Sequence, residues 1–319
     1  MINREIIRAK VLQLVYAYYQ NGINNTNDGN NGLNNAEKEL MFSLGKAYDL
    51  YNYMLELMIA IGKEMTRRYE IALQRADREG TEKPSAKFVE NLFLLQLSEN
   101  TQLNDYINEK GLSWADDQHG IVMKIAMAIE QSDIYMDYMA EEEKSYDNDR
   151  EIWRKIYKTF IHNNEELEAL LEEKSLYWND DKDVVDTFVI KTIKRFDLAN
   201  GKNQELLPEY SDEDGREFAR RLFLSAITNA ETYQRYMSEA SRNWDFSRLA
   251  FMDIIIMQIA IAEMLNFTNI PVTVTINEYV DLAKFYSTPR SSGYINGMLD
   301  SIARHLIKTG KMFKTMPER

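Results

Sequence analysis

The stretch VTINEYVDLAKFYSTPRSSGYINGMLD (residues 274–300) decides between two folds for the C-terminal part of this chain. It contains Asn296-Gly297, the dipeptide that most strongly predicts a two-residue β-hairpin turn. The apolar residues around that dipeptide nevertheless recur every fourth position, on one face as Tyr294, Met298 and Ile302 and on the next as Ile295, Leu299 and Ala303. This period predicts a single helix over residues 291–308.

A glycine inside that helix requires an explanation. Gly297 costs about 1 kcal/mol relative to alanine in a helix interior. We therefore expect a neighbouring helix to cross closely at Gly297, with both residues of the dipeptide packed inward and the Asn296 amide hydrogen-bonded. Direct contact of Asn296 and Gly297 with a ligand is the alternative.

The segments before this stretch are also mostly helical in pattern. LAFMDIIIMQIAIAEML (249–265) is the most apolar segment of the chain, but charged and polar residues interrupt it. We therefore predict a buried helix there and not a membrane span. PVTVTI (271–276) is rich in β-branched residues, which by themselves favour a strand. Elsewhere the apolar residues recur with helical period, which predicts an all-α chain.

The composition excludes several kinds of site. The 319 residues include no cysteine, so disulfides, thiolate metal sites and cysteine nucleophiles are excluded. The sequence has no Gly-rich phosphate loop, and His119, His162 and His305 lack partners at metal-ligand spacing. We therefore predict no catalytic residue, no metal, no cofactor and no enzymatic activity. The first twenty residues lack the apolar core of a signal peptide, which predicts a cytoplasmic protein.

The charge is distributed unevenly along the chain. A formal net charge of −13 at first argues against nucleic acid as a ligand, because phosphates require Lys and Arg. Residues 1–20 have a net charge of +2, residues 245–319 of +1, and residues 21–244 hold the remaining −16. Both ends can therefore face an anion. The acidic part begins with NGINNTNDGNNGLNN (21–35), whose composition predicts a flexible loop.

Three features follow one another in residues 245–309. An apolar helix ends in IAEML, a proline precedes VTINEYVDLAKFYS, and a loop leads to YINGMLD. This order resembles the NusB family of bacterial transcription antitermination factors, with its pattern I-N-E-x-[VI]-x-L-[AV]-K followed by [FY]-[VI]-N-G-[VIL]-L-D. The matching residues are Asn277, Glu278, Leu282, Lys284, Tyr294, Asn296, Gly297, Leu299 and Asp300. REIIRAKVLQLVYAYYQNG (4–22) also resembles the family's Arg-rich first helix.

The resemblance implies how the chain is organised. Residues 1–20 and 206–310 are expected to form a NusB-like, RNA-binding helical bundle core. Residues 36–205 have no counterpart in the pattern and are interpreted as an acidic helical insertion. The basic tail, 311–319, is expected to be disordered. The resemblance also replaces the strand expected at 271–276 by a helix.

The resemblance implies a function as well. In the family, the protein pairs with ribosomal protein NusE, and the pair binds single-stranded boxA RNA in nascent ribosomal RNA transcripts and helps RNA polymerase resist termination. Such binding requires basic side chains and an exposed aromatic residue on which a base stacks. Tyr294 occupies the position expected for that aromatic residue, and a core aromatic at a helix start is the alternative. The further RNA contacts expected are Arg4, Arg8, Lys10, Arg290, Ser291 and Ser292. Glu263 is expected to face NusE.

Two other functions compete with this interpretation. The chain is a candidate for a scaffold that has lost RNA binding and holds basic proteins through its acidic insertion. It also resembles the NusB-like domain that precedes a methyl-donor domain in some ribosomal RNA methyltransferases, although no Gly-rich α/β segment follows here. For Arg4 and Arg8, the alternative to phosphate contact is a surface position without a ligand.

Overall fold

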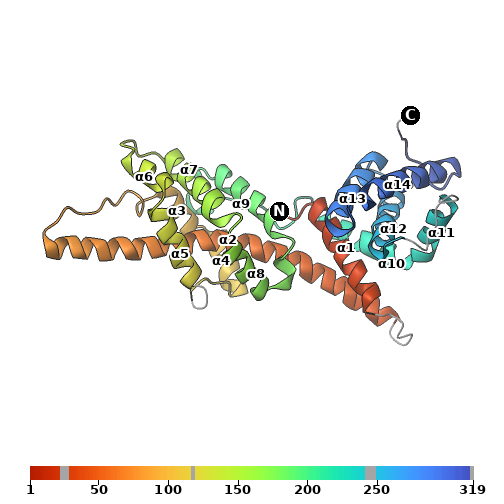
Figure 1. Cartoon of the computed structure of the whole chain (residues 1–319), viewed down its shortest axis with the longest axis horizontal. Coiled ribbons are helices and arrows are strands. Elements are labelled where there is room, and N and C mark those ends of the chain that lie inside the picture. Colours follow the sequence, from red (N-terminus) through yellow and green to blue (C-terminus); the bar gives the residue numbers. More distant parts are fainter. Residues whose placement is uncertain (22–28, 116–118, 241–248, 317–319) are drawn as a thin grey trace. The chain divides into compact units, whose positions relative to one another are not determined.

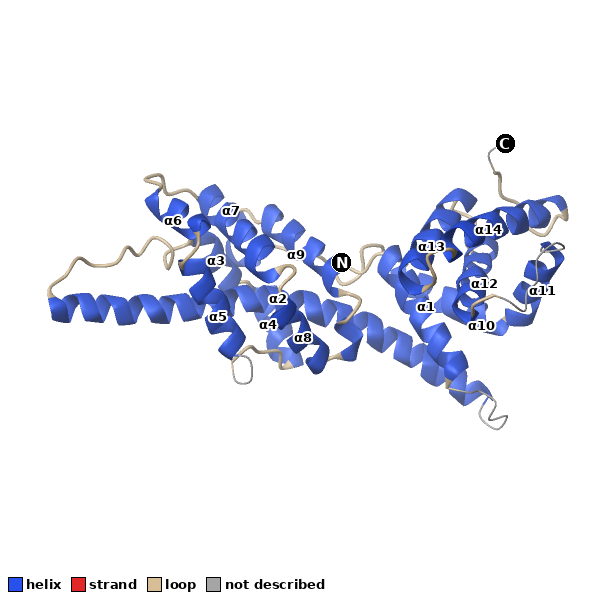
Figure 2. Cartoon of the chain, in the orientation of Figure 1, coloured by secondary structure: helices blue, strands red, loops and turns tan. Residues whose placement is uncertain are grey.

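The computed structural model describes residues 1–21, 29–115, 119–240 and 249–316, apart from the side chains of 29–31 and 119. Within these ranges the chain is helical and contains no β-strand (Figure 2). A single parallel β-bridge joins Ile2 and Tyr210. These observations confirm the all-α prediction. None of the described helices combines the length and the apolar character needed to cross a lipid bilayer.

The chain divides into two compact units. Unit 1 consists of Met1 and residues 45–209, and unit 2 consists of residues 2–44 and 210–319. The long helix α2 (Gly29–Glu79) contains the boundary between residues 44 and 45 (Figure 1). Unit 1 thus begins and ends a few residues later than the insertion expected from the sequence.

Unit 1 surrounds the later part of α2 with shorter elements. In chain order these are α3 (Leu92–Ser98), α4 (Thr101–Lys110), α5 (His119–Glu130), α6 (Asp133–Ala140), α7 (Tyr146–Ile156), the π-helix η1 (Tyr157–Ile161), α8 (Glu165–Lys174), the 3-10 helix η2 (Leu176–Trp178), α9 (Lys182–Arg195) and the 3-10 helix η3 (Leu198–Asn203). Side-chain caps define several helix starts, because Asn91 and Asn100 accept hydrogen bonds from the first turns of α3 and α4. Gly62 allows α2 and α3 to pack closely, since a Cβ atom at this position would lie 2.1 Å from Leu94 Cδ2.

Unit 2 is a helical bundle built around α12. Its elements are α1 (Arg4–Gln20), the early part of α2, α10 (Gly215–Thr228), α11 (Ala230–Ala240), α12 (Phe251–Asn266), α13 (Val272–Tyr286) and α14 (Ser291–Lys308). Helix α12 is buried continuously from Ile255 to Met264, because the other helices of the unit cover it on several sides. Helices α1, α10, α11, α13 and α14 all pack against it. An apolar, little-interrupted segment therefore forms the core helix, as the sequence predicted.

The two C-terminal helices resolve the question raised by the Asn-Gly dipeptide. Residues 272–286 form α13 and residues 291–308 form α14, so both the strand and the hairpin are excluded. The expectation of a close helix crossing at Gly297 was wrong, because among the described residues no other helix has an atom within 4 Å of the position of an added Cβ. Asn296 and Gly297 are exposed, since α14 buries the face that contains Ile295 and Leu299. The fold therefore offers no packing reason for Gly297.

Two segments are more ordered than the sequence suggested. Helix α2 already begins at Gly29, so the loop predicted at 21–35 is helical in its second half, and residues 22–28 lie outside the described part. Low helix propensity is overridden there because α2 is fixed by the burial of Leu40 and Leu44. The described part of the tail, residues 311–316, also contacts the core, since Met312 is buried.

Candidate nucleic-acid interface

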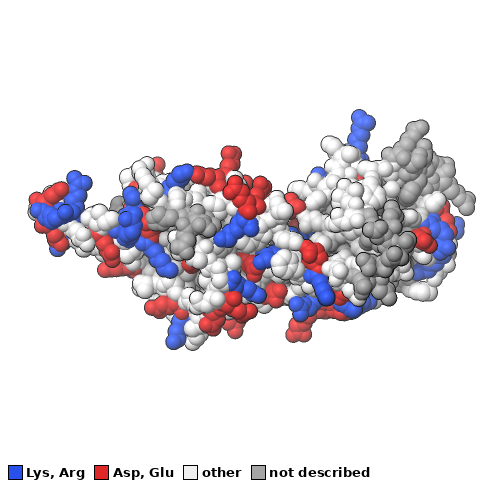
Figure 3. Space-filling model, turned by 90° about the horizontal axis from the view of Figure 1, so that it is seen from below, with Lys and Arg blue, Asp and Glu red and all other residues white. Residues whose placement is uncertain are grey.

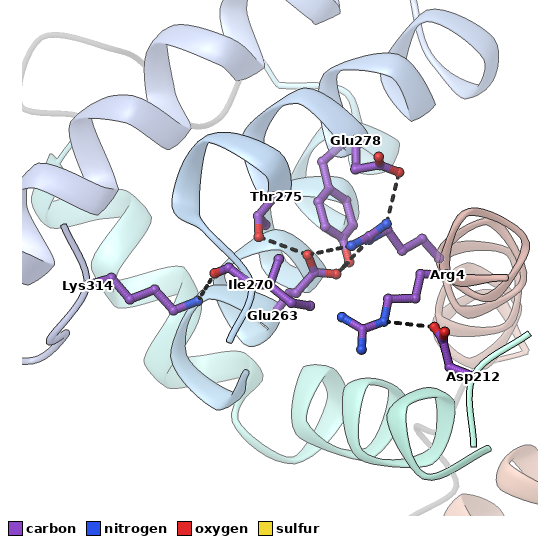
Figure 4. A network of polar contacts seen from close by, with 9 residues as sticks. Arg4, Asp212, Glu263, Ile270, Thr275, Glu278 and Lys314 are labelled. Atoms are coloured by element: carbon purple, nitrogen blue, oxygen red, sulfur yellow. Dashed lines mark hydrogen bonds and ion pairs between the residues drawn. The ribbon is translucent and has the colours of Figure 1, made fainter. Parts of the chain in front are cut away.

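A polar network in the interior of unit 2 links α1, α12 and α13. Glu263 of α12 is fully buried and accepts two hydrogen bonds from Arg8 of α1, at 2.7 Å from Nε and 3.0 Å from Nη2. Thr275 and Tyr279 of α13 donate to the same carboxylate at 2.8 and 3.2 Å. Glu278 accepts a further bond from Arg8 Nη1 at 2.9 Å. Figure 4 shows Glu263 at the centre of these contacts.

The burial of Arg8 and Glu263 makes the loss of either partner costly. Burial alone lowers the pKa of Arg8, but the hydrogen bonds and the charge of Glu263 outweigh this effect and raise it. Burial and then the charge of Glu263 raise the pKa of Tyr279 well above its usual value. Removing one partner of a buried ion pair leaves an uncompensated charge, which typically costs about 3–5 kcal/mol. Arg8 and Glu263 therefore hold three helices together.

This network corrects three assignments made from the sequence. Arg8 is only 4% exposed and is bonded to two carboxylates, so it does not face an RNA phosphate. Lys10 is buried as well, at 2% exposure. Glu263 has no accessible surface with which to contact a partner protein. All three residues lie on the inward face of their helix, which the charge pattern alone did not reveal.

Arg4 differs from Arg8 although both belong to α1. Its side chain is partly exposed and lies 3.6 Å from both Asp212 and Asp214. Figure 4 shows the contact with Asp212. Its guanidinium also lies 5.0 Å from the ring centroid of Phe218. Arg4 thus remains accessible to an anion, although two carboxylates already compete for it.

A second polar cluster positions the loop before α14. Asp253 in the first turn of α12 is buried and accepts hydrogen bonds from Ser287 Oγ and, at 2.9 Å, from Ser291 Oγ. Thr288 Oγ1 lies 2.8 Å from Ser291 Oγ. The Ser291 hydroxyl is therefore used within the protein, which corrects its assignment as an RNA contact. Its role in the structure is to fix where α14 begins.

The first turn of α14 presents the other predicted residues at the surface. Arg290 is exposed and is the N-cap residue of α14, but a guanidinium has no acceptor with which to cap the helix. Ser292 and Tyr294 are partly exposed. Partial burial, followed by the charge of Asp253, raises the pKa of Tyr294. The structure thus brings Arg290, Ser292 and Tyr294 together at the positive end of a helix dipole, where anions bind favourably.

Aromatic residues that the sequence analysis did not select lie where α1 ends and α12 begins. The ring of Phe251, 43% exposed, lies 5.8 Å from the ring of Tyr16 and 6.1 Å from that of Tyr19. Gln13 of α1 donates to the hydroxyl of Tyr286 at the end of α13 at 3.0 Å. The aromatic end of the first helix was a signal in the sequence, but its partner Phe251 could not be identified without the fold.

The two histidines with described side chains are hydrogen-bonded within the protein. His162 Nδ1 lies 2.8 Å from Asp186, and His305 Nε2 lies 3.3 Å from Glu239. His162, Asp183 and Asp186 come close enough to hold a metal ion, with ligand atoms within 4.8 Å of one another. However, Asp186 is also bonded to the Lys182 ammonium at 2.8 Å, so a cation already neutralises it. The side chain of His119 lies outside the described part of the chain.

Unit 2 is thus an all-α bundle with a buried, charged centre and an edge that contains basic and aromatic residues. Residues 187–304 match the model of the NusB family. A transcription antitermination protein NusB of Salinibacter ruber is 31% identical over 133 residues, which cover 40% of this chain and 83% of that protein. The corresponding protein of Geotalea daltonii is 35% identical over 135 residues, or 42% of this chain and 89% of that protein.

A solved structure of T. maritima NusB is 26% identical and covers 43% of this chain and 87% of that chain, with a TM-score of 0.28. The assignment depends on the sequence relatives and not on this superposition. On their identity and coverage, the chain belongs to the NusB family. The relatives match less than half of the chain, and the family model begins at residue 187, so this family member contains further helical structure before that residue.

Proposed function

We propose that this protein acts in transcription antitermination. It pairs with ribosomal protein NusE, binds single-stranded boxA-like RNA in nascent ribosomal RNA transcripts, and joins the complex in which RNA polymerase resists termination. The names of the relatives support the general role. The observation that carries the RNA contact is the position of Tyr294, partly exposed in the first turn of α14 beside Arg290.

The chemistry of this edge suits single-stranded RNA. A base that stacks on an aromatic side chain gains about 1–3 kcal/mol, without strong sequence preference. Arg290 and the positive end of α14 attract the adjoining phosphate, and the Ser292 hydroxyl can hydrogen-bond to phosphate or base. Tyr16 and Phe251 provide further ring surface for neighbouring bases. Binding of this kind involves no bond-making step, in keeping with a role other than catalysis.

The buried residues have no direct part in this proposal. Arg8 and Glu263 act through the fold by holding α1 against α12, and Lys10 is buried within the same unit. Arg4 remains a candidate phosphate contact, because its side chain is partly exposed. With Glu263 buried, no individual residue is assigned to NusE.

The scaffold hypothesis receives less support from the charges of unit 1. Several of its acidic residues are paired with arginine, as in Glu64 with Arg67 and Glu130 with Arg68. Figure 3 shows acidic and basic side chains interspersed on the face in view. A surface that holds basic proteins by charge requires a larger region of one sign.

A gel shift with boxA-type RNA, with and without the cognate NusE, tests the proposal. We expect a complex whose affinity increases when NusE is added. An RNA of the same length with a scrambled sequence serves as the control. The absence of any NusE-dependent shift would contradict the proposed function, and binding of basic proteins without RNA binding would favour the scaffold.

A further inference from the structure

One face of α14 continues from Tyr294 towards the far end of the helix. Ser301, His305 and Lys308 follow Tyr294 by 7, 11 and 14 residues, which places all four within about 60° of one another around the helix axis. Ser301 and Lys308 are exposed, and His305 is partly exposed. At 1.5 Å per residue, Lys308 lies about 21 Å along the axis from Tyr294. These residues and the neighbouring Gly297 form what we call the α14 stripe.

Gly297 leaves this stripe without a side chain near Tyr294. Glycine is unfavourable inside a helix, and the fold does not require it here, because an added Cβ would meet open space. A position without a side chain allows a ligand to approach the helix backbone closely. The residue therefore suits a ligand that runs along α14 from Tyr294.

The stripe ends in a cluster of cations contributed by three segments. The basic patch consists of Arg235 and Tyr236 of α11, His305 and Lys308 of α14, and Lys311 after the helix. The carboxylate of Glu239 lies 4.0 Å from Arg235, 3.3 Å from His305 and 3.5 Å from Lys311. Arg235 is 63% exposed. The charged side chains of the patch thus have a net positive charge even with Glu239 included, in a protein that is acidic as a whole.

The cation beyond the helix is held in place by the backbone. Gly310 adopts a left-handed conformation with a φ of 69°, and the amides of Lys311 and Met312 both donate to the carbonyl of Leu306. This turn sets the ammonium of Lys311 4.4 Å from the ring centroid of Tyr236. The burial of Met312 and the bond from Lys314 to Ile270 O, drawn in Figure 4, fix the segment that follows. The patch is therefore pre-organised.

A purely structural explanation covers only part of the patch. The negative end of the α14 dipole favours cations in the last turn, which accounts for His305 and Lys308. It does not account for Arg235 and Tyr236, which belong to α11. It also does not account for the open position at Gly297.

We propose that the α14 stripe and the basic patch bind the phosphate backbone of the RNA that adjoins the boxA-like element. This inference depends on the proposed function, because it extends the RNA path that begins at Tyr294. A linear polyanion fits better than a compact one, since the stripe is narrow and its cations lie far from Tyr294. Contacts to phosphates bind without sequence preference and strengthen as salt is lowered.

Fluorescence anisotropy on the full chain with NusE tests this inference. The probes are a minimal boxA-type RNA and the same RNA extended at either end by about ten nucleotides, within the usual site size of single-strand binders. We expect the wild type to bind one of the two extended RNAs, the one whose extension reaches the basic patch, several-fold more tightly than the minimal RNA. In Arg235→Gln/Lys311→Gln, this gain should disappear while binding of the minimal RNA stays unchanged. For the extended RNA, the slope of log affinity against log salt should decrease in magnitude by about 1.4, the value for two phosphate contacts on single-stranded RNA.

The matched control is Lys124→Gln/Lys144→Gln, which also removes two basic residues that pair with glutamate, here two exposed lysines of unit 1. It should leave both affinities unchanged. Circular dichroism verifies that each variant is folded.

Two further variants separate ligand contact from a structural role. Glu239→Gln removes the carboxylate that pairs with Arg235, His305 and Lys311, and it should raise the affinity for the extended RNA several-fold. Substitution of a residue with only a structural role would not raise this affinity. Gly297→Gln places a side chain in the open position and should lower that affinity.

The possible failures can be distinguished. If the minimal RNA is not bound at all, the proposed function fails. If the minimal RNA is bound but neither extension adds affinity, or if the patch variant keeps the gain, this inference alone is overturned. Loss of poly-glutamate binding in the patch variant, with RNA binding unchanged, would also overturn it and assign the patch to an acidic protein.

Discussion

The interior of unit 2 and the first turn of α14 contain residues of the same family pattern but use them differently. In the interior, Glu278 belongs to a network in which Arg8 and Glu263 are almost completely buried. At the edge, Arg290 is exposed and Tyr294 is only partly covered. Charged residues of the interior stabilise the bundle, whereas those of the edge remain accessible to a ligand.

The difference shows that a basic residue of the first helix can serve the fold and need not be available to a ligand. Arg8 and Arg4 are one helical turn apart on α1, yet only Arg4 reaches the surface. Their roles follow from which carboxylates surround them, and these come from α12 and α13 for Arg8 and from the segment before α10 for Arg4. Substitutions that separate stability from binding can therefore test the comparison.

The largest effect is expected at Arg8. Arg8→Ala leaves the Glu263 carboxylate buried without its cation, and we expect a loss of about 3–5 kcal/mol in the free energy of unfolding of unit 2. Urea denaturation monitored by circular dichroism measures it. Arg4→Ala is the control, because exposed ion pairs contribute only about 0–1 kcal/mol. Equal losses in the two variants would remove the distinction between interior and edge.

A smaller effect on stability, of opposite sign, is expected from substitution of Gly297. Gly297→Ala should raise the free energy of unfolding by up to about 1 kcal/mol, because the added methyl group meets open space and alanine favours the helix. Gly62→Ala is the matched control and should destabilise, since its Cβ would collide with Leu94. Destabilisation by Gly297→Ala would show that this position packs against the fold after all.

The smallest effect is expected from substitution of Arg290, and it concerns RNA binding and not stability. Arg290→Gln should reduce the slope of log affinity against log salt by about 0.7, the value for one phosphate contact on single-stranded RNA. Unfolding should be unchanged, because the side chain is exposed and does not cap α14. An unchanged slope, measured by titrating RNA at several salt concentrations, would remove Arg290 from the interface.

The helices of unit 2 could be predicted from sequence because their period is local. The spacing of apolar residues in 291–308 matches α14, and the apolar run at 249–265 matches α12 to within a few residues. The β-branched residues at 271–276 were misleading on their own, since Thr275 and Ile276 pack inward from a helix. Tertiary burial outweighed their preference for strands.

The candidate site could be predicted only in part, because burial depends on distant segments. Nothing near Arg8 in the sequence shows that Glu263, 255 residues away, accepts its hydrogen bonds. In the same way, Ser291 could not be known to bond to Asp253, nor Phe251 to meet Tyr16. The exposure of Arg290 and Tyr294 at a helix start, in contrast, agrees with the local pattern.

The most direct test of the division between interior and edge is the affinity of Tyr294→Ala for boxA-type RNA in the presence of NusE. We expect binding to weaken by about 1–3 kcal/mol, the contribution of one stacked base, while the variant stays folded. Tyr294→Phe is the control, because it keeps the ring and should bind nearly as well as the wild type. Unchanged affinity in folded Tyr294→Ala would contradict an RNA contact at the first turn of α14.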